Sequence, residues 1–96
     1  MPLTVLALTS LRPGGDAALS QYLVVVGPLM QAAGARVLSR HAVQETLAGA
    51  APEFVSLVEY PDRAALAAVF DHPDYRALQA VKDQAFTRYE VCVLGD

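Results

Sequence analysis

Four segments of the chain carry the β-branched and apolar residues, or the alternation of apolar and polar positions, that are typical of β-strands. They are residues 3–9, 35–41, 54–60 and 87–94. In the second segment, the alternation places Arg36, Leu38 and Arg40 on one face. The pattern therefore predicts four short strands.

The stretch between the first two predicted strands has helical periodicity instead. Its apolar residues recur every three or four positions and form one stripe, made of Leu19, Tyr22, Leu23, Val26, Met30 and Ala33. Asp16 has the chemistry of an N-terminal cap, and Gly34 that of a C-terminal one. Pro28 cannot donate to the carbonyl four residues back, so we expect a kink or a loosened turn there. Val24 and Val25 lie off the stripe, which predicts a second contact for this helix.

A second helical region lies between the third and fourth predicted strands. Asp62 is expected to cap a short first helix, and His72 and Pro73 interrupt it. Pro73 suits the first position of a further helix. The inner side of that further helix is marked by Tyr75, Leu78, Val81, Ala85 and Phe86. Residues 42–52 are expected to form a hairpin connection that includes a bent strand extension near residues 44–47.

The element order is strand, helix, strand, strand, helix, strand. Two right-handed crossovers then give an α+β fold, a four-stranded antiparallel sheet with both helices on one face, in a single domain over residues 1–96. The opposite face still carries apolar residues, Leu38, Cys92 and Leu94 among them. A second sheet packed face to face would cover it. The sequence therefore predicts a homodimer through sheet-to-sheet packing.

Composition narrows the class of protein. The 96 residues are 54% hydrophobic and 18% charged, with a net charge of −3, which excludes general disorder and argues against nucleic-acid binding. The longest apolar run, residues 23–30, is far short of the roughly 20 residues that span a bilayer. The single Cys92 is expected to be a small buried hydrophobe. No phosphate-binding or metal motif occurs, so we expect no cofactor and no metal. The single cysteine and the short apolar run predict a cytoplasmic protein without a membrane partner.

Several motifs, in their order, resemble a bacterial family of small dimeric α/β-barrel proteins, a domain of unknown function numbered thirteen-thirty. They are Tyr22, Pro28 and Gly34, then residues 55–61, and residues 70–75. The likeness spans residues 3–94 and implies a ferredoxin-like βαββαβ fold and a dimeric α/β barrel. The wider superfamily includes cofactor-free monooxygenases, haem-degrading enzymes, muconolactone isomerases and stress-response proteins, so the resemblance implies no single reaction.

The chain also departs from that family's pattern. His41 and Ala42 stand where relatives often have two glycines, and Phe54 stands where relatives usually have arginine. If those groups bind a ligand in relatives, the ligand of this chain differs.

Two residues are candidates for proton transfer. Glu59 lies inside an otherwise apolar strand, where a carboxylate acts either as a general base or as half of a structural ion pair with Arg36, Arg40 or Arg88. His41 could move a proton near neutral pH, with Arg40 beside it to clamp a carboxylate. The alternative for Arg40 and His41 is a charged rim paired across the dimer.

Tyr22, His72 and Tyr75 complete the candidate ligand-binding residues, together with Arg40. Tyr22 either packs in the core or lines a small cavity between helix and sheet. His72 either caps a helix or contacts a ligand, and Tyr75 either packs under its helix or reaches the same cavity.

These residues predict a small-molecule-binding protein or small enzyme with a mostly apolar cavity and a polar rim. As an enzyme it would carry out proton transfer or cofactor-free oxygenation on a small acidic or aromatic compound. The alternative is a non-catalytic dimeric interaction or stress-response module.

Overall fold

The computed structural model describes residues 1–95. Its elements are, in order, β1 (Leu3–Leu11), α1 (Asp16–Ala32), β2 (Arg36–Ala42), β3 (Phe54–Tyr60), α2 (Arg63–Phe70), α3 (Pro73–Arg76), α4 (Gln79–Ala85) and β4 (Phe86–Leu94). The predicted domain extends to residue 96, which lies outside the described residues.

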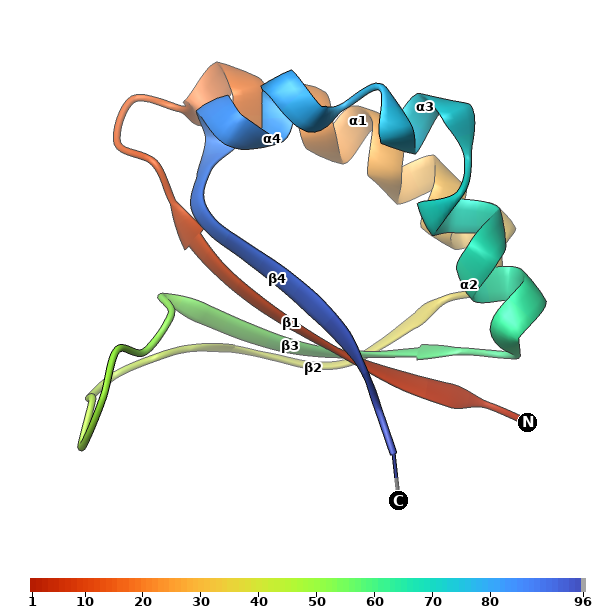
Figure 1. Ribbon diagram of the computed structural model, residues 1–96, viewed down its shortest axis with the longest axis horizontal. Coiled ribbons are helices and arrows are strands. Elements are labelled where there is room, and N and C mark those ends of the chain that lie inside the picture. Colours follow the sequence, from red (N-terminus) through yellow and green to blue (C-terminus); the bar gives the residue numbers. More distant parts are fainter. Residues whose placement is uncertain (96) are drawn as a thin grey trace.

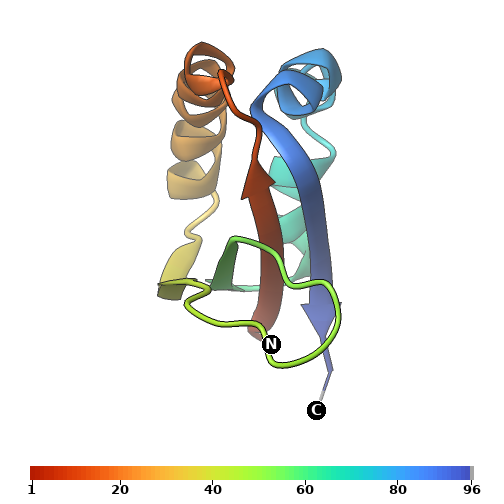
Figure 2. The same ribbon diagram turned by 90° about the vertical axis from the view of Figure 1, so that its left-hand side faces the viewer.

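The strands form one antiparallel sheet in the order β2-β3-β1-β4, with β1 and β3 in the middle. Figures 1 and 2 show the helices together on one face of this sheet. The predicted α+β, ferredoxin-like fold is confirmed. In the register, Val5 on β1 lies opposite Val58 on β3 and Val93 on β4, and this row faces the helices. The core between the layers consists of Val5, Ala18, Tyr22, Val26, Val58, Tyr60, Val69, Tyr75, Leu78, Ala85 and Phe86.

The two ends of α1 are shaped by glycines. Asp16 is the first helical residue rather than the cap, because Gly15 holds the cap position, where a Cβ would collide with the backbone carbonyl of Gln84 on α4. At the other end Gly34 has φ +76°, and the amides of Gly34 and Ala35 bond back into the last turn, as predicted for a glycine-terminated helix. The helix continues through Pro28.

The second helical region matches its predicted caps but not its predicted length. The carboxylate of Asp62 accepts from the amide of Ala65 at 2.7 Å and caps α2. Pro73 opens α3, as predicted. The predicted single helix that follows is wrong: it breaks at Leu78 into α3 and α4, and Phe86 already belongs to β4.

An irregularity in β2 overturns one predicted face. Val37 pairs with Val58, but Ser39 pairs with Leu57, so Leu38 is an extra residue in the strand. The extra residue reverses the alternation. Arg36 therefore lies opposite Glu59 on the face away from the helices, whereas Arg40 pairs with Ser56 on the helix-facing side. The predicted grouping of Arg36 with Arg40 is wrong for this reason.

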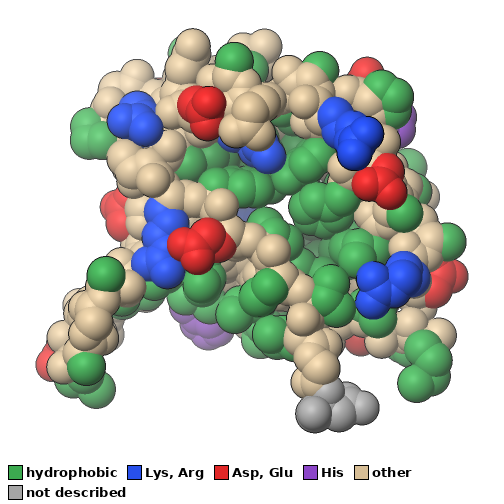
Figure 3. All heavy atoms as spheres, viewed as in Figure 1, with side chains coloured by type: hydrophobic (Ala, Val, Ile, Leu, Met, Phe, Trp, Pro, Cys, Tyr) green, Lys and Arg blue, Asp and Glu red, His purple; other side chains and the backbone are tan. Residues whose placement is uncertain are grey.

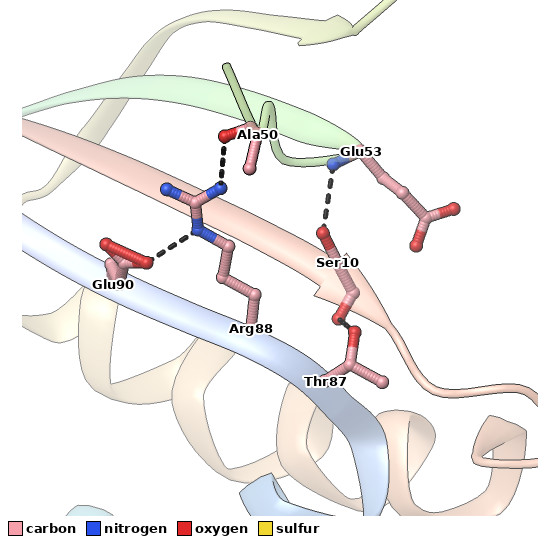
Figure 4. Close-up of polar contacts among 6 residues, drawn as sticks. All are labelled: Ser10, Ala50, Glu53, Thr87, Arg88 and Glu90. Carbon is pink, nitrogen blue, oxygen red and sulfur yellow. Dashed lines mark hydrogen bonds and ion pairs between the residues drawn. The ribbon is translucent and has the colours of Figure 1, made fainter.

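The connection between β2 and β3 projects beyond the sheet (Figure 1) and contains no strand extension near residues 44–47. Its return is fixed by polar contacts shown in Figure 4: Arg88 donates to the Ala50 carbonyl at 3.0 Å, and the Glu53 amide donates to Ser10 Oγ at 3.1 Å. The Glu53 carboxylate also accepts from the Leu11 amide at 2.6 Å. These bonds tie the loop to the end of β1 and to β4.

The sheet face away from the helices, here called the outer face, has an apolar centre. Its half-exposed or exposed apolar side chains are Leu6, Leu8, Val55, Leu57, Cys92 and Leu94. The ion pairs Arg36–Glu59 and Arg88–Glu90 lie at its sides. Cys92 is exposed in the isolated chain, so the prediction that it is buried is wrong within one chain.

On α1, Val25 packs against the core as a second contact of the helix, but Val24 is 73% exposed. Val25 therefore adds to the contact with the core, and the predicted contact of this helix on a second side stays a prediction.

Candidate functional site

A cleft of about 700 Å³ opens between α2 and the β4 edge of the sheet. Its walls are apolar: Leu66, Ala67 and Phe70 from α2 face Val5, Val91 and Val93 from the sheet. Arg63 and Asp71 stand at the two ends of α2, and Tyr75 and Tyr89 complete the lining. Figure 3 shows this face of the molecule hollowed, with hydrophobic side chains inside the hollow and charged side chains around it. Volumes of about 300–1,000 Å³ and mostly apolar walls are typical of small-molecule sites.

Three tyrosine hydroxyls meet beside the cleft, which Tyr75 and Tyr89 line. The hydroxyl of Tyr89 on β4 lies 2.7 Å from that of Tyr22 on α1 and 2.7 Å from that of Tyr75 on α3. Tyr89 therefore stands in the middle of a hydrogen-bonded chain that joins two helices to the sheet. We call Tyr22, Tyr89 and Tyr75 the tyrosine chain.

Aromatic packing holds the tyrosine chain in place. The Tyr22 ring meets Phe86 edge to face with centroids 5.2 Å apart, and Phe70 meets Tyr75 edge to face at 5.0 Å. Such contacts stabilise by roughly 0.5–1.5 kcal/mol beyond the area they bury. They also fix the ring directions, and hence the positions of the hydroxyl groups.

Burial raises the pKa of two of these phenols, those of Tyr22 and Tyr89, still further above neutral pH. It raises the pKa of Tyr22 to about 12, against a partial lowering by the hydrogen bond to Tyr89. Burial, assisted by the neighbouring tyrosines, raises the pKa of Tyr89 further above its usual range. At neutral pH, both therefore act as hydrogen-bond donors and acceptors and not as bases.

Lys82 on α4 brings a positive charge to the same place. Its Nζ lies 4.7 Å from the ring centroid of Tyr75 and 4.6 Å from that of Tyr89, distances at which a cation is attracted to an aromatic face. Nζ also makes a long contact of 3.4 Å with the Tyr75 hydroxyl. Among residues 1–95, no carboxylate lies within ion-pair distance of this ammonium.

The position of α4 is fixed from the β1–α1 connection. Arg12 Nε donates to the Asp83 carbonyl at 2.9 Å, and its backbone amide donates to the Ala85 carbonyl at 2.9 Å. These bonds satisfy carbonyls at the end of α4 that have no partner within the helix. They hold the helix that carries Lys82 against the start of β4.

The structure does not bring the six sequence-predicted site residues together. Glu59 lies on the outer face and makes an ion pair with Arg36, whose Nη2 is 3.0 Å from its Oε1. Arg40 and His41 lie on β2, the edge of the sheet opposite β4 and therefore opposite the cleft. The ion-pair alternative for Glu59 is confirmed. The predicted roles of Glu59, Arg40 and His41 in binding or catalysis stay predictions.

Among the other three, two belong to the tyrosine chain. Tyr75 lines the cleft, and Tyr22 is 9% exposed and lies behind it. His72 is outside the cleft lining: its Nδ1 accepts from the Asp74 amide at 3.0 Å and caps α3. The capping alternative for His72 is confirmed, and its predicted ligand contact stays a prediction.

Sequence reasoning missed Tyr89 and Lys82 as site residues. Tyr89 is two residues from Val91 on the inward-facing side of a strand, which indicates the face but not the contact with Tyr22. Lys82 follows Tyr75 by seven residues, a spacing that would place both on one side of a continuous helix. The break at Leu78 means that tertiary packing, and not that spacing, brings Lys82 over the two rings.

Two kinds of feature are missing from the part of the chain that the structure describes. Residues 1–95 contain no group of three or more His, Cys, Asp or Glu side chains placed to hold a metal ion. None of the described helices is long and apolar enough to cross a membrane.

Comparison with known proteins identifies the family. The family model described as "Domain of unknown function (DUF1330)" matches residues 4–95. No curated protein matches the sequence.

Three solved structures show the same fold. A protein of unknown function from Rhodopseudomonas palustris, RPA0582, is 24% identical, with a TM-score of 0.80 over 99% of this chain and 82% of its own. A DABB-family protein with a ferredoxin-like fold from Mesorhizobium loti is 15% identical, with a TM-score of 0.66 over 99% and 96%. A dimeric ferredoxin-like protein of unknown function from Thermobifida fusca is 17% identical, with a TM-score of 0.58 over 100% and 92%.

Proposed function

Since this chain belongs to the DUF1330 family, whose function is unknown, we propose from its own geometry that it is a homodimeric protein that binds a small, mostly apolar compound in the cleft between α2 and β4. The observation that carries the proposal is the cleft itself. Its apolar walls adjoin the tyrosine chain at Tyr75 and Tyr89, so a ligand would meet side-chain hydrogen-bonding groups there and at the two ends of α2, where Arg63 and Asp71 stand. Apolar walls with a few convergent polar groups are the usual design of ligand sites.

The homodimer is supported by the outer face and by the relatives. Helices leave the outer face uncovered, and its central residues, Leu6, Leu57 and Leu94 among them, are apolar. The charged residues at its sides are neutralised in pairs within the chain. A second copy fits such a face, because two apolar sheets pack with the paired charges at the rim. The relative from Thermobifida fusca is described as dimeric.

If the bound compound reacts, the cleft favours proton-transfer chemistry over attack by a tyrosinate. The raised pKa values keep Tyr22 and Tyr89 neutral, so the tyrosine chain would donate hydrogen bonds to a ligand oxygen that gains negative charge. Cofactor-free oxygenation would use the same feature, since it also passes through an electron-rich ligand. Proton transfer and cofactor-free oxygenation would therefore both take place on a compound bound in the same cleft.

The test fills the cleft. Ala67 lies in the cleft wall on α2, and Ala68, the next residue, points to solvent. Native mass spectrometry and nuclear magnetic resonance titration with a library of small aromatic and aliphatic compounds would identify ligands of the wild-type protein. We expect Ala67→Trp to abolish their binding and Ala68→Trp to leave it unchanged.

Two outcomes would count against the proposal. Binding that survives Ala67→Trp would place the ligand elsewhere. A stable dimer that binds no compound in the library would favour the non-catalytic interaction module instead.

A further inference from the structure

The direction of the hydrogen bonds in the tyrosine chain follows from burial. Tyr22 is 9% exposed, and among residues 1–95 its hydroxyl has one hydrogen-bond partner, the hydroxyl of Tyr89. If Tyr22 accepted from Tyr89, its own proton would be a buried donor without an acceptor, which costs about 1–3 kcal/mol. Tyr22 therefore donates to Tyr89.

The remaining protons follow from that first one. Tyr89 has a single O–H, and with Tyr22 donating to its oxygen it donates onward to Tyr75. The Tyr75 oxygen then accepts from Tyr89 and, more weakly at 3.4 Å, from the Lys82 ammonium, which has no acceptor capacity of its own. The proton of Tyr75 is left over, and Tyr75 lines the cleft. A chain of hydrogen bonds in one direction strengthens its last donor.

Two positively charged side chains, Lys82 and Arg63, lie near this donor or in the cleft wall. Lys82 lies over the rings of Tyr75 and Tyr89, and Arg63 stands in the cleft wall. Asp71 is the one carboxylate of the described lining. Neither Arg63 nor Lys82 makes an ion pair with another residue in the range 1–95. Lys82 itself lines a smaller neighbouring hollow, with Asp83, that shares Tyr89 with the cleft. The cleft thus presents the Tyr75 hydroxyl proton at the end of an apolar slot, and the Lys82 ammonium lies next to that hydroxyl across the two tyrosine rings.

We propose that the ligand is a small apolar acid, a compound with an apolar or aromatic body and one anionic oxygen group, which accepts from the Tyr75 hydroxyl beside the Lys82 ammonium. This inference rests on the proposed function, since it names the class of compound for the same cleft. The apolar body contacts α2 and β4, and the anionic group replaces the missing partner of Lys82.

The experiment compares matched probes. Benzoate, phenylacetate and hexanoate are titrated against the wild-type protein in parallel with their neutral amides, and amide chemical shifts report both affinity and location. Each pair shares its body and a carbonyl acceptor and differs in charge. We expect each carboxylate to bind about tenfold more tightly than its amide, as a hydrogen bond to a charged group is stronger than one to a neutral group.

Variants separate the contributions of the two residues. We expect Lys82→Met to bring the carboxylate and amide affinities within about twofold of each other, and Lys82→Arg to preserve the preference. Tyr75→Phe is expected to weaken both probes of a pair, because both accept from the hydroxyl. Arg76→Met, on the neighbouring helix α3 and outside the cleft lining, removes one positive charge and serves as the control for a general electrostatic effect.

The outcomes distinguish the two proposals. Equal affinity for carboxylates and amides in the wild-type cleft, or a carboxylate preference that persists in Lys82→Met, would overturn the acid ligand and leave the binding cleft intact. If neither kind of probe perturbs cleft residues up to millimolar concentration, the binding cleft fails together with the acid ligand.

Discussion

The hydroxyl of Tyr22 on α1 lies 2.7 Å from the hydroxyl of Tyr89 on β4, and this bond joins residues 67 positions apart. Tyr89 makes a second bond to Tyr75, so one phenol connects both helical segments to the sheet. The number of bonds that each hydroxyl makes leads to an order of stability among phenylalanine variants.

Tyr89→Phe removes both bonds and leaves the buried Tyr22 hydroxyl without a partner, which costs about 1–3 kcal/mol. For a domain of this size that corresponds to a melting temperature lower by roughly 4–8 °C per kcal/mol. Tyr22→Phe removes one bond and leaves Tyr89 paired with Tyr75, so its loss is expected to be smaller, about 0.5–1.5 kcal/mol. Thermal unfolding followed by circular dichroism measures both. If Tyr22→Phe were less stable than Tyr89→Phe, Tyr89 would not be the hydroxyl that makes two hydrogen bonds.

Alkaline pH should destabilise the protein before the tyrosines of the folded state ionise. Burial raises the pKa of Tyr22 and of Tyr60 to about 12 in the folded protein, while the unfolded chain loses these protons near pH ~10. Between these values the unfolded state binds fewer protons, so the free energy of unfolding falls as pH rises, by about 1.4 kcal/mol per pH unit for each group. The full contribution is present below pH ~10.

Urea denaturation at a series of pH values between about 9 and 12 gives this slope. Tyr89, whose pKa burial also raises, acts in the same direction. Tyr22→Phe removes one of these three groups and is expected to make the fall shallower. A free energy of unfolding that stays level over this range would contradict the assignment.

Gly15 at the N-cap of α1 and Gly27 inside that helix should respond differently to alanine. A Cβ at Gly15 would collide with the Gln84 carbonyl of α4, so Gly15→Ala is expected to destabilise the protein by about 1–3 kcal/mol. A Cβ at Gly27, inside α1, meets nothing within 4 Å beyond its chain neighbours and its own helix, but the ring of Pro28 crowds the Cβ of a helical residue before it. This crowding offsets the gain from replacing a helical glycine, so Gly27→Ala is expected to change stability by less than about 1 kcal/mol. Urea denaturation compares them. Equal effects of the two substitutions would mean that α1 and α4 do not approach as described.

The ion pair between Arg36 and Glu59 is half exposed, with side-chain exposures of 70% and 33%, and is expected to stabilise little. A double-mutant cycle with Arg36→Met and Glu59→Gln should give a coupling of about 0.2–1 kcal/mol, decreasing in high salt. A coupling of several kcal/mol would indicate that a partner sheet buries the pair. Because the apparent stability of a dimer depends on protein concentration, all variants in the cycle are measured at one fixed concentration.

The outer face should control assembly. Leu57 lies at its centre, between Leu6 and Ser39 in the register, and Leu57→Arg would place an unpaired charge in the proposed dimer interface. We expect a monomer by light scattering at micromolar concentration. Val24→Arg adds the same charge at the 73% exposed position on α1 and should remain a dimer. The reactivity of Cys92 is a second measure of assembly, because the proposed dimer would cover this residue of the outer face. Its thiol is expected to react with a maleimide faster in Leu57→Arg than in Val24→Arg. A wild-type protein that is monomeric would refute sheet-to-sheet pairing.

The sequence alone predicted features that depend on neighbours in the chain. The third strand, the Asp62 and Gly34 caps, and the start of a helix at Pro73 were predicted where the structure places them, because each follows from contacts within a few residues. The order of strands and helices followed from the same local signals. With few ways to connect these elements, the order sufficed for the four-stranded sheet.

Only the tertiary structure decided where the candidate site lies. One extra residue at Leu38 reversed the alternation in β2 and separated Arg40 from Arg36, although the sequence pattern is continuous there. Glu59 pairs with Arg36 on the neighbouring strand, and the packing of α4 places Lys82 over the rings of Tyr75 and Tyr89. A binding site needs side chains from distant elements at distances of a few ångströms. Periodicity assigns each side chain to a face of its own element, and only packing determines which faces meet.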